Sequence, residues 1–260
     1  MPSSTRLKRT SKFLFLLLLP FWCALLGATA AAQSDITAQN AREGALGGCL
    51  LFEPGVGLVE AAYSNGFLAA GMDNRMLRLQ FPVGRLSTLR FEGSAFGNED
   101  YMELKGEAML WLRLSSWMQL GAGAKWLHVG FSDPHYRSPD WVEAGLAILT
   151  RWKKSGALLQ IESRSWDHRH PFGLRLQAHY LPLPGLMGLV QYDMSDCRRW
   201  RLGMEYNHEQ WLAVRGGLAT NPLVLTFGLG ARYLDYALDL GVEVHRWLGL
   251  SPRLSLSWWL

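Results

Sequence analysis

Residues 223–260 read LVLTFGLGARYLDYALDLGVEVHRWLGLSPRLSLSWWL, and their apolar and polar positions alternate in three successive runs. In 223–233 the odd positions are apolar or aromatic, while the even positions are mostly glycine, threonine or arginine. The runs 236–246 and 252–260 repeat this pattern. Alternation with a period of two indicates β-strands that have one face in an apolar medium and the other in a polar one. The stretch therefore predicts three consecutive strands, the last of which ends at Leu260.

The same alternation continues towards the N-terminus and predicts an all-β chain. The predicted strands are 55–63, 75–82, 87–96, 101–114, 117–129, 141–152, 157–165, 172–181, 186–194, 200–207, 211–218, 223–233, 236–246 and 252–260. Their number is even, as single-chain bacterial barrels require, and most are about as long as a tilted strand that crosses a bilayer. We therefore predict one domain, 55–260, that folds as a transmembrane antiparallel β-barrel of about 14 strands. A soluble β-sandwich is the alternative, but it would need fewer aromatic residues at strand ends.

The connections between the predicted strands fall into two groups by length. If Leu260 lies in the periplasm, the connections on that side are all short turns, and every long loop lies outside. This asymmetry is typical of outer-membrane barrels, so we expect the chain in the outer membrane of a Gram-negative cell, surrounded by outer-membrane lipid. The final strand also ends in aromatic and apolar residues, which is the signal that the barrel-assembly machinery recognises in such barrels. We expect this signal to consist of Leu254, Leu256, Trp258 and Leu260.

Residues 1–32 have the features of a cleavable signal peptide. A basic start precedes the apolar run 13–27, and the small residues 28–32 follow it. The chain has 26 Lys and Arg against 22 Asp and Glu, and the four surplus cations are Arg6, Lys8, Arg9 and Lys12. The remainder is therefore neutral, and its charge gives no reason to expect a nucleic-acid partner.

Residues 33–54 lie between the signal peptide and the first predicted strand. They include the apolar, glycine-rich segment 41–52. This segment is suited to fold into the barrel lumen as a hatch. An ordinary N-terminal strand or a periplasmic extension is an equal alternative.

Charged residues of both signs occupy the inward positions of the predicted strands. These candidates for lining the lumen are Arg90, Glu92, Glu103, Lys105, Glu107, Glu143, Glu162, Arg164, Arg175, Arg201, Glu205, Arg215, Arg232, Asp239 and Glu243. Charges of one sign would favour an ion-selective pore, whereas a balanced set favours a network of ion pairs that fills the interior. We therefore expect most of these charges to brace the barrel, and the lumen to be narrow or plugged.

Few residues point to catalysis or to metal binding. The segment Asp167-His168-Arg169-His170 concentrates histidines, but it falls in a polar loop with no further ligand specified nearby. His128 and His245 lie near external strand ends, where Ser163 or Ser165 could approach one of them, although nothing in the spacing fixes a Ser–His pair. We expect no enzymatic activity, no cofactor and no metal.

The C-terminal region also resembles a known family. The motifs that carry the resemblance are Leu212-Ala213-Val214-Arg215-Gly216-Gly217, Thr226-Phe227-Gly228-Leu229-Gly230, Leu234-Asp235-Tyr236-Ala237, His245, Leu248-Gly249 and Pro252-Arg253-Leu254-Ser255, with Ala41-Arg42 and Ala45-Leu46-Gly47-Gly48 near the N-terminus. They are similar to motifs of the FadL/PorV-like outer-membrane barrels, which include the PorV and PorQ type IX secretion proteins of Bacteroidetes. The family's usual Asn-Pro-Ala is replaced here by Phe52-Glu53-Pro54-Gly55, and the chain is short for the family. The resemblance implies a fourteen-stranded barrel but does not assign its role.

Three functions are compatible with this reading. We expect a non-enzymatic component of protein secretion or surface attachment of PorV/PorQ type, with secretion-system proteins as partners. A FadL-like channel for small hydrophobic compounds, with a lateral opening through the barrel wall, is the alternative. A lipid-modifying enzyme of the outer membrane is a weaker one. An apolar tunnel would favour the channel, whereas a lumen occluded by the Arg/Glu set would favour the secretion component.

Overall fold

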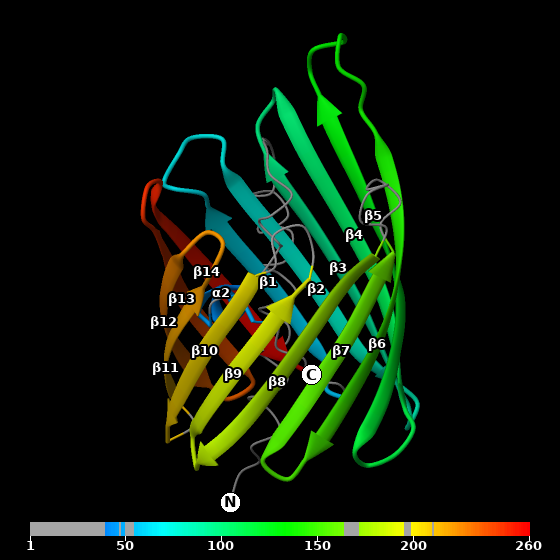
Figure 1. The fold of residues 1–260 in the computed structure, drawn as a ribbon, viewed down its shortest axis with the longest axis vertical. Helices are drawn as coiled ribbons and strands as arrows, with labels where there is room; N and C mark the ends of the chain where they lie inside the picture. The colour runs from blue at the N-terminus through cyan, green and yellow to red at the C-terminus, as the bar shows by residue number, and fades with distance from the viewer. Residues whose placement is uncertain (1–39, 47, 50–54, 164–171, 195–198, 210) are drawn as a thin grey trace, which may run out of the picture.

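A computed structural model describes residues 40–46, 48–49, 55–163, 172–194, 199–209 and 211–260. These residues form one short helix and a closed antiparallel barrel of fourteen strands (Figure 1). The elements are α2 (Ala41–Ala45), β1 (Leu58–Asn65), β2 (Asp73–Val83), β3 (Ser87–Gly97), β4 (Tyr101–Arg113), β5 (Met118–Phe131), β6 (Asp140–Trp152), β7 (Ser155–Ser163), β8 (Phe172–Leu183), β9 (Leu186–Asp193), β10 (Arg199–His208), β11 (Leu212–Ala219), β12 (Val224–Tyr233), β13 (Tyr236–His245) and β14 (Gly249–Trp259). The predicted fold class and strand number are confirmed.

The barrel closes where its first and last strands meet. β1 pairs with β14 in an antiparallel register that runs from Leu58 opposite Trp259 to Ser64 opposite Arg253. Each predicted strand overlaps an observed one. The largest shifts are at the first strand, which begins three residues later than predicted, and at the last, which begins three residues earlier. The cause at the first strand is Gly55, which has a φ of 89° and so turns the chain before the strand begins.

The two faces of the wall differ as the alternation predicts. In β4, for example, Met102, Leu110 and Leu112 are exposed on the outer face, whereas Glu103 and Trp111 are buried inside. The same pattern around the ring leaves a broad exposed band of apolar side chains. Water-soluble proteins rarely carry so large an apolar surface, and a lipid-facing band accounts for it. A single closed sheet also rules out the two packed sheets of a sandwich.

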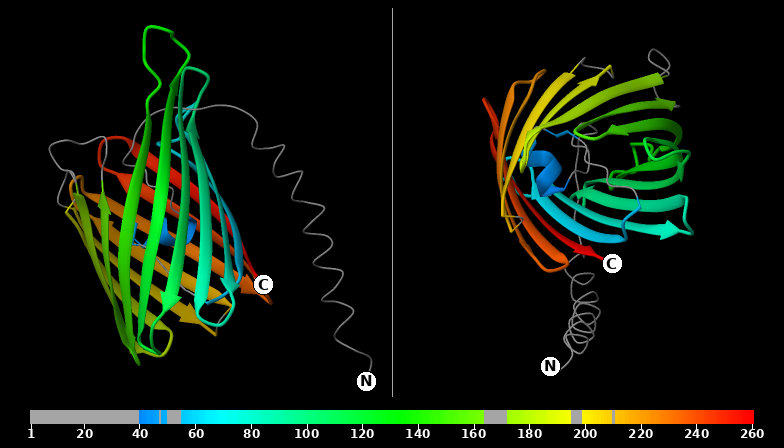
Figure 2. Two further views of the ribbon diagram at one scale, coloured as in Figure 1. Left: turned by 90° about the vertical axis from the view of Figure 1, so that its right-hand side faces the viewer. Right: turned by 90° about the horizontal axis from the view of Figure 1, so that it is seen from below.

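The two ends of the barrel differ in their connections. At the end where β12 meets β13, which we call the turn end, consecutive strands are joined by turns of two to four residues. At the other end, which we call the loop end, most connections are longer, and they include 66–72 and 132–139. The walls also differ in height, because β4, β5 and β6 have 13, 14 and 13 residues whereas β9 and β11 have 8 each (Figure 2).

Several predictions concern residues outside the described part of the chain. These are the signal peptide 1–32, most of the segment 33–54, the lumen candidate Arg164 and the histidine loop 167–170. No helix among the described residues is long and apolar enough to cross a membrane.

Candidate functional site in the barrel lumen

The helix α2 lies inside the ring of strands, against the inner wall formed by β11–β14 and β1 (Figure 2). Its start is fixed locally, because the side chain of Asn40 accepts a hydrogen bond of 2.6 Å from the backbone N–H of Glu43. This is the usual way in which an asparagine caps a helix N-terminus. The amide of Asn40 also donates to Glu60 at 2.7 Å, so the cap is itself attached to the wall.

Two ion pairs join α2 to the two strands that flank this wall, β10 on one side and β2 on the other. Arg42 donates two hydrogen bonds to the carboxylate of Glu205 on β10, at 2.8 and 2.7 Å. Glu43 lies 3.3 Å from Arg78 on β2, which also pairs with Glu60 at 2.9 Å. Except for Arg42, these side chains are almost fully buried. Removing one member of such a network leaves an uncompensated buried charge, so the pairs hold the helix in one position.

Backbone contacts complete the docking of the N-terminal segment. The hydroxyl of Thr226 donates to the carbonyl oxygen of Ala45 at 2.9 Å, and Ser255 accepts from the backbone N–H of Ala41 at 3.2 Å. Arg201 donates to the carbonyl oxygen of Gly48 at 2.9 Å. Polar groups of the segment that would be orphaned in a dry lumen therefore find partners on the wall.

Glycines on the inner wall provide the room for this segment. A Cβ atom at Gly203 would lie 2.7 Å from the carbonyl oxygen of Leu46, and one at Gly241 would lie 2.8 Å from that of Ala41. A Cβ atom at Gly228 would overlap the side chain of Ala45. The Gly228-Leu229-Gly230 motif therefore serves close packing against α2 and the wall.

All the described lumen candidates lie on the inner face of the wall. Most form ion pairs or hydrogen bonds there: Arg90 with Glu92, Lys105 with Glu103, Lys125 with Glu143, Gln160 with Glu162, Arg175 with Asp193, Arg215 with Glu205 and Asp239, and Arg253 with Glu243. Glu107 is inward on β4, and Arg201 and Arg232 take other partners. Arg232 stacks its guanidinium 4.3 Å from the ring centroid of Trp259 at the turn end.

Sequence reasoning missed the residues at the centre of this network. Glu60, Arg78 and Asp193 were not among the candidates, although each is at most 7% exposed. Arg78 alone contacts three carboxylates, those of Glu43, Glu60 and Glu92. A usable signal was present, because Leu77, Leu79 and Phe81 alternate with Arg78 and Gln80 and place both polar residues on the inner face.

The opposite inner wall carries a cluster of apolar side chains towards its turn end. Met109, Trp111, Ala147, Leu149 and Leu158 form one cluster of buried side chains on β4, β6 and β7. We call this cluster the apolar lumen patch. Leu127 and Val129 are also inward and 7% exposed, but Lys125 lies between them and this patch along β5. The lumen therefore holds α2 on one side and the apolar lumen patch on the other, with ion pairs on both sides.

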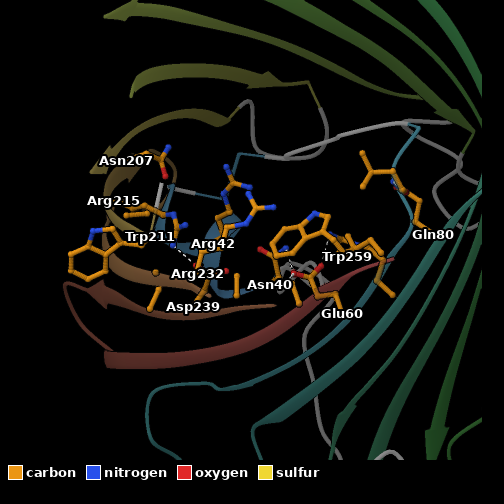
Figure 3. Close-up of a pocket in the computed structure, with 18 of the residues that line it drawn as sticks. Asn40, Arg42, Glu60, Gln80, Asn207, Trp211, Arg215, Arg232, Asp239 and Trp259 are labelled. Carbon is orange, nitrogen blue, oxygen red and sulfur yellow. Dashed lines mark hydrogen bonds and ion pairs between the residues drawn. The ribbon is translucent and has the colours of Figure 1, made fainter. Parts of the chain in front are cut away.

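A cavity of about 330 Å³ lies between α2 and the turn end (Figure 3). It is lined by Asn40 and Arg42 from the N-terminal segment and by Trp211, Arg232 and Trp259 from the rim, among others. Because the cavity has both aromatic and cationic walls, it can accept an apolar group with a polar or anionic end.

The residues considered for catalysis do not come together. His128 lies 3.0 Å from Asp140, and its ring stacks on Trp126, all on the outer face. The hydroxyl of Ser163 instead accepts a hydrogen bond of 2.9 Å from the backbone N–H of Ala144. Within the described residues, no serine hydroxyl is hydrogen-bonded to a histidine, and no three His, Cys, Asp or Glu side chains could together hold a metal.

No family model and no curated protein matches the sequence. Many solved structures are similar in fold, and they include an outer membrane protein and a transporter. The outer membrane protein Omp33 of Acinetobacter baumannii gives a TM-score of 0.57 at 8% identity, covering 79% of this chain and 98% of that protein. The toluene transporter TbuX of Ralstonia pickettii gives 0.56 at 9% identity, covering 86% of this chain and 98% of that protein. At such low identity the likeness concerns the fold alone, and the fold of this chain is that of the outer-membrane β-barrels.

Proposed function

We propose that this protein is an outer-membrane channel for small hydrophobic compounds, and that its own N-terminal segment closes it. We place the barrel in the membrane with its turn end facing the periplasm and its loop end facing the cell exterior, as in other barrels with short turns on one side. In this proposal the whole lumen serves as the passage, and transport requires no catalytic group.

The observation that carries this proposal is the apolar lumen patch. The interior of a water-filled porin is polar, whereas here Met109, Trp111, Leu149 and Leu158 face the lumen and are buried. Exposing these side chains to water in an open pore would be unfavourable, by about 25 cal/mol for each Å² of apolar surface. A solute that is itself apolar would replace that water at no such cost.

The docking of α2 supports a closed resting state. The helix lies across the side of the lumen formed by β11–β14 and β1, and its ion pairs with Glu205 and Arg78 connect it to β10 and β2. The wall itself is continuous in the described strands, since each is hydrogen-bonded to both neighbours around the ring. The described strands therefore leave no lateral opening of the kind considered for a FadL-like channel. The passage that we propose runs along the barrel axis. TbuX, described as a toluene transporter, shares the fold.

The test measures the initial rate of radiolabelled toluene uptake by cells that carry the protein in their outer membrane. The variant L149Q/L158Q makes the apolar lumen patch polar, and we expect it to lose most of the uptake. Glycerol permeability serves as the control, because it should not fall in the same variant. Wild-type uptake no faster than in cells without the protein would overturn the proposal.

A second candidate is the secretion or surface-attachment role of PorV/PorQ type. The observation that favours this role is that α2 occludes the side of the lumen formed by β11–β14 and β1, since a scaffold needs no open passage. Purification in mild detergent would distinguish the two. Stable co-purification of secretion-system proteins, together with the absence of toluene uptake, would favour the scaffold.

A further inference from the structure

A groove runs along the outer face of the wall formed by β2 to β6. Three strands of this wall, β4 to β6, are the longest in the barrel and can be followed in Figure 1. The volume of the groove is about 450 Å³, which lies in the range of small-molecule binding sites. Its floor is a pair of glycines directly opposite each other, Gly93 on β3 and Gly106 on β4. The outward side chains around this floor are Leu77, Leu79, Phe91, Trp126 and Val142.

The two floor glycines are not required by packing. A Cβ atom at Gly93 would have its nearest neighbour at 4.0 Å, and one at Gly106 at 3.7 Å, so both would make only ordinary van der Waals contacts. The inward Gly123 differs, since a Cβ atom there would lie 2.6 Å from a backbone oxygen. Neither floor glycine has a positive φ. Glycine weakens a strand relative to residues with side chains, so its use here keeps a groove open at some cost in stability.

The groove lies in the half of the membrane nearest the loop end. An apolar band about 25 Å tall corresponds to roughly ten residues of a strand tilted by about 40°. Counted from Trp117, at the turn end of β5, this band ends close to Trp126. There the indole N–H of Trp126 donates to Asp140 at 3.0 Å, and His128 lies 3.0 Å from the same oxygen. These polar groups stand directly above the groove, as at a membrane–water boundary.

We infer that the groove binds one hydrocarbon chain of a lipid from the leaflet at the loop end. The chain would lie over Gly93 and Gly106, and the polar part of the lipid would lie beside His128 and Asp140. The apolar lining and the single polar end match an amphiphile in this orientation. The site is separate from the proposed channel, because the wall beneath it is continuously paired from Leu77 through Gly93, Gly106 and Trp126 to Val142.

The width of the floor favours a hydrocarbon chain over a protein partner. The floor consists of two strands about 4.8 Å apart, and the side chains of Leu77 and Trp126 stand on the strands to either side of it. An α-helix with its side chains is about 10–12 Å across and would rest on the flanking side chains without reaching the glycines. The outer wall of a second barrel is convex and would leave the floor empty.

Photolabelling in a defined membrane tests this inference. The protein is inserted into phosphatidylcholine vesicles that contain a trace of phosphatidylcholine with a diazirine midway along one acyl chain. After illumination, labelled peptides are mapped by mass spectrometry. We expect peptides from β3, β4 and β5 to be labelled several-fold more than the outward face of β9 to β11. The variant G93L/G106L should reduce this labelling to the level of the rest of the wall.

The matched control is G188L, which places a leucine at an outward glycine of β9 where a Cβ atom would likewise make only ordinary van der Waals contact, at 3.9 Å. It should leave the labelling of β3 to β5 unchanged. A heat-dependent gel shift verifies that each variant forms a barrel. Uniform labelling of the wild-type wall would overturn the inference, and this result does not depend on any variant. Unchanged labelling in a folded G93L/G106L barrel would overturn it as well, as would cross-links between two copies of the chain at this groove.

Discussion

Single buried charges decide how firmly the N-terminal segment is held. Glu205 is 1% exposed and bridges Arg42 on α2 with Arg215 on β11, at 2.7 and 2.6 Å. In the variant E205Q both guanidinium groups lose this carboxylate. Removing one partner of a buried ion pair destabilises the fold by more than the intact pair stabilises it, because the other charge is left buried and uncompensated. We expect the free energy of unfolding to fall by about 3 kcal/mol, as measured by urea titration in lipid vesicles.

The double variant R42Q/E205Q is the control for E205Q, because it removes a buried charge from each side of the pair. It should recover part of the lost free energy, since coupled residues do not contribute additively. A loss in the double variant equal to the sum of the losses in E205Q and in R42Q alone would show that Arg42 and Glu205 act independently.

A second residue reports on how tightly the segment is packed. Cys49 is a free, fully buried thiol beside Leu46 and Leu189. Burial raises its pKa from 9.0 to about 12, and Glu43 adds to the rise, while Arg201 opposes it. Because only the thiolate reacts, we expect maleimide to label Cys49 at pH 8 roughly a thousandfold more slowly than an ordinary cysteine.

The labelling is measured in a C23S/C197S background, so that Cys49 is the remaining thiol. An added cysteine at Ser132, in the exposed loop 132–139, provides the reference rate. Labelling of Cys49 at that reference rate in the folded barrel would contradict the buried position. Full labelling after denaturation verifies that the thiol itself is intact.

Among the elements, the strands were predictable and the position of α2 was not. Each strand follows from local alternation, which a single face in lipid imposes on its own residues. The docking of α2 depends instead on partners far away in the sequence, such as Thr226 and Ser255, and on the space above Gly203. No local pattern in 40–49 encodes these contacts. The sequence therefore left a hatch and an extension equally open.

The apolar lumen patch was overlooked for a related reason. In β6 and β7 both faces are largely apolar over 144–149 and 157–161, so alternation does not separate an inward Leu149 or Leu158 from an outward neighbour. The register of the closed barrel is needed to bring these residues beside Trp111.

The variant G203V tests whether α2 acts as a removable element. The three heavy atoms nearest to a Cβ atom at this position all belong to Leu46, with its carbonyl oxygen at 2.7 Å, and valine is well suited to a strand. We therefore expect the wall to form normally and the segment to be displaced. Ionic conductance in planar bilayers should rise well above that of the wild type. The control G188V, on the outer face, should conduct like the wild type, and an unchanged conductance in G203V would contradict the docking.

At the scale of the whole molecule, closure depends on the last strand. β14 pairs with β1 over seven positions, and Leu260 adds a hydrogen bond of 3.0 Å from its N–H to the carbonyl oxygen of Gly57. Trp258, one of the residues expected to form the assembly signal, stacks on Tyr236 with ring centroids 6.2 Å apart. The C-terminal residues thus contribute to the seam as well as to the predicted signal.

A chain truncated after Ser257 should fail to close, because it loses the pairing of Trp258 and Trp259 with β1. We expect it to lack the heat-dependent gel shift that the full chain shows in mild detergent. The variant W258F retains an aromatic ring and should keep the shift. If the truncated chain still showed the heat-dependent gel shift, the seam between β1 and β14 would be stable without its last paired residues.

The unequal wall heights have a consequence for the surrounding bilayer. About ten residues of β5 lie within the apolar band between Trp117 and Trp126, whereas β11 has 8 residues in all, a difference of roughly 5 Å along the barrel axis for strands tilted by about 40°. Lipids beside the short wall must compress their chains or the whole barrel must lean, and each ångström of mismatch costs a fraction of a kcal/mol. The protein therefore imposes a gradient of membrane thickness around its circumference, and thinner membranes would favour a more upright barrel.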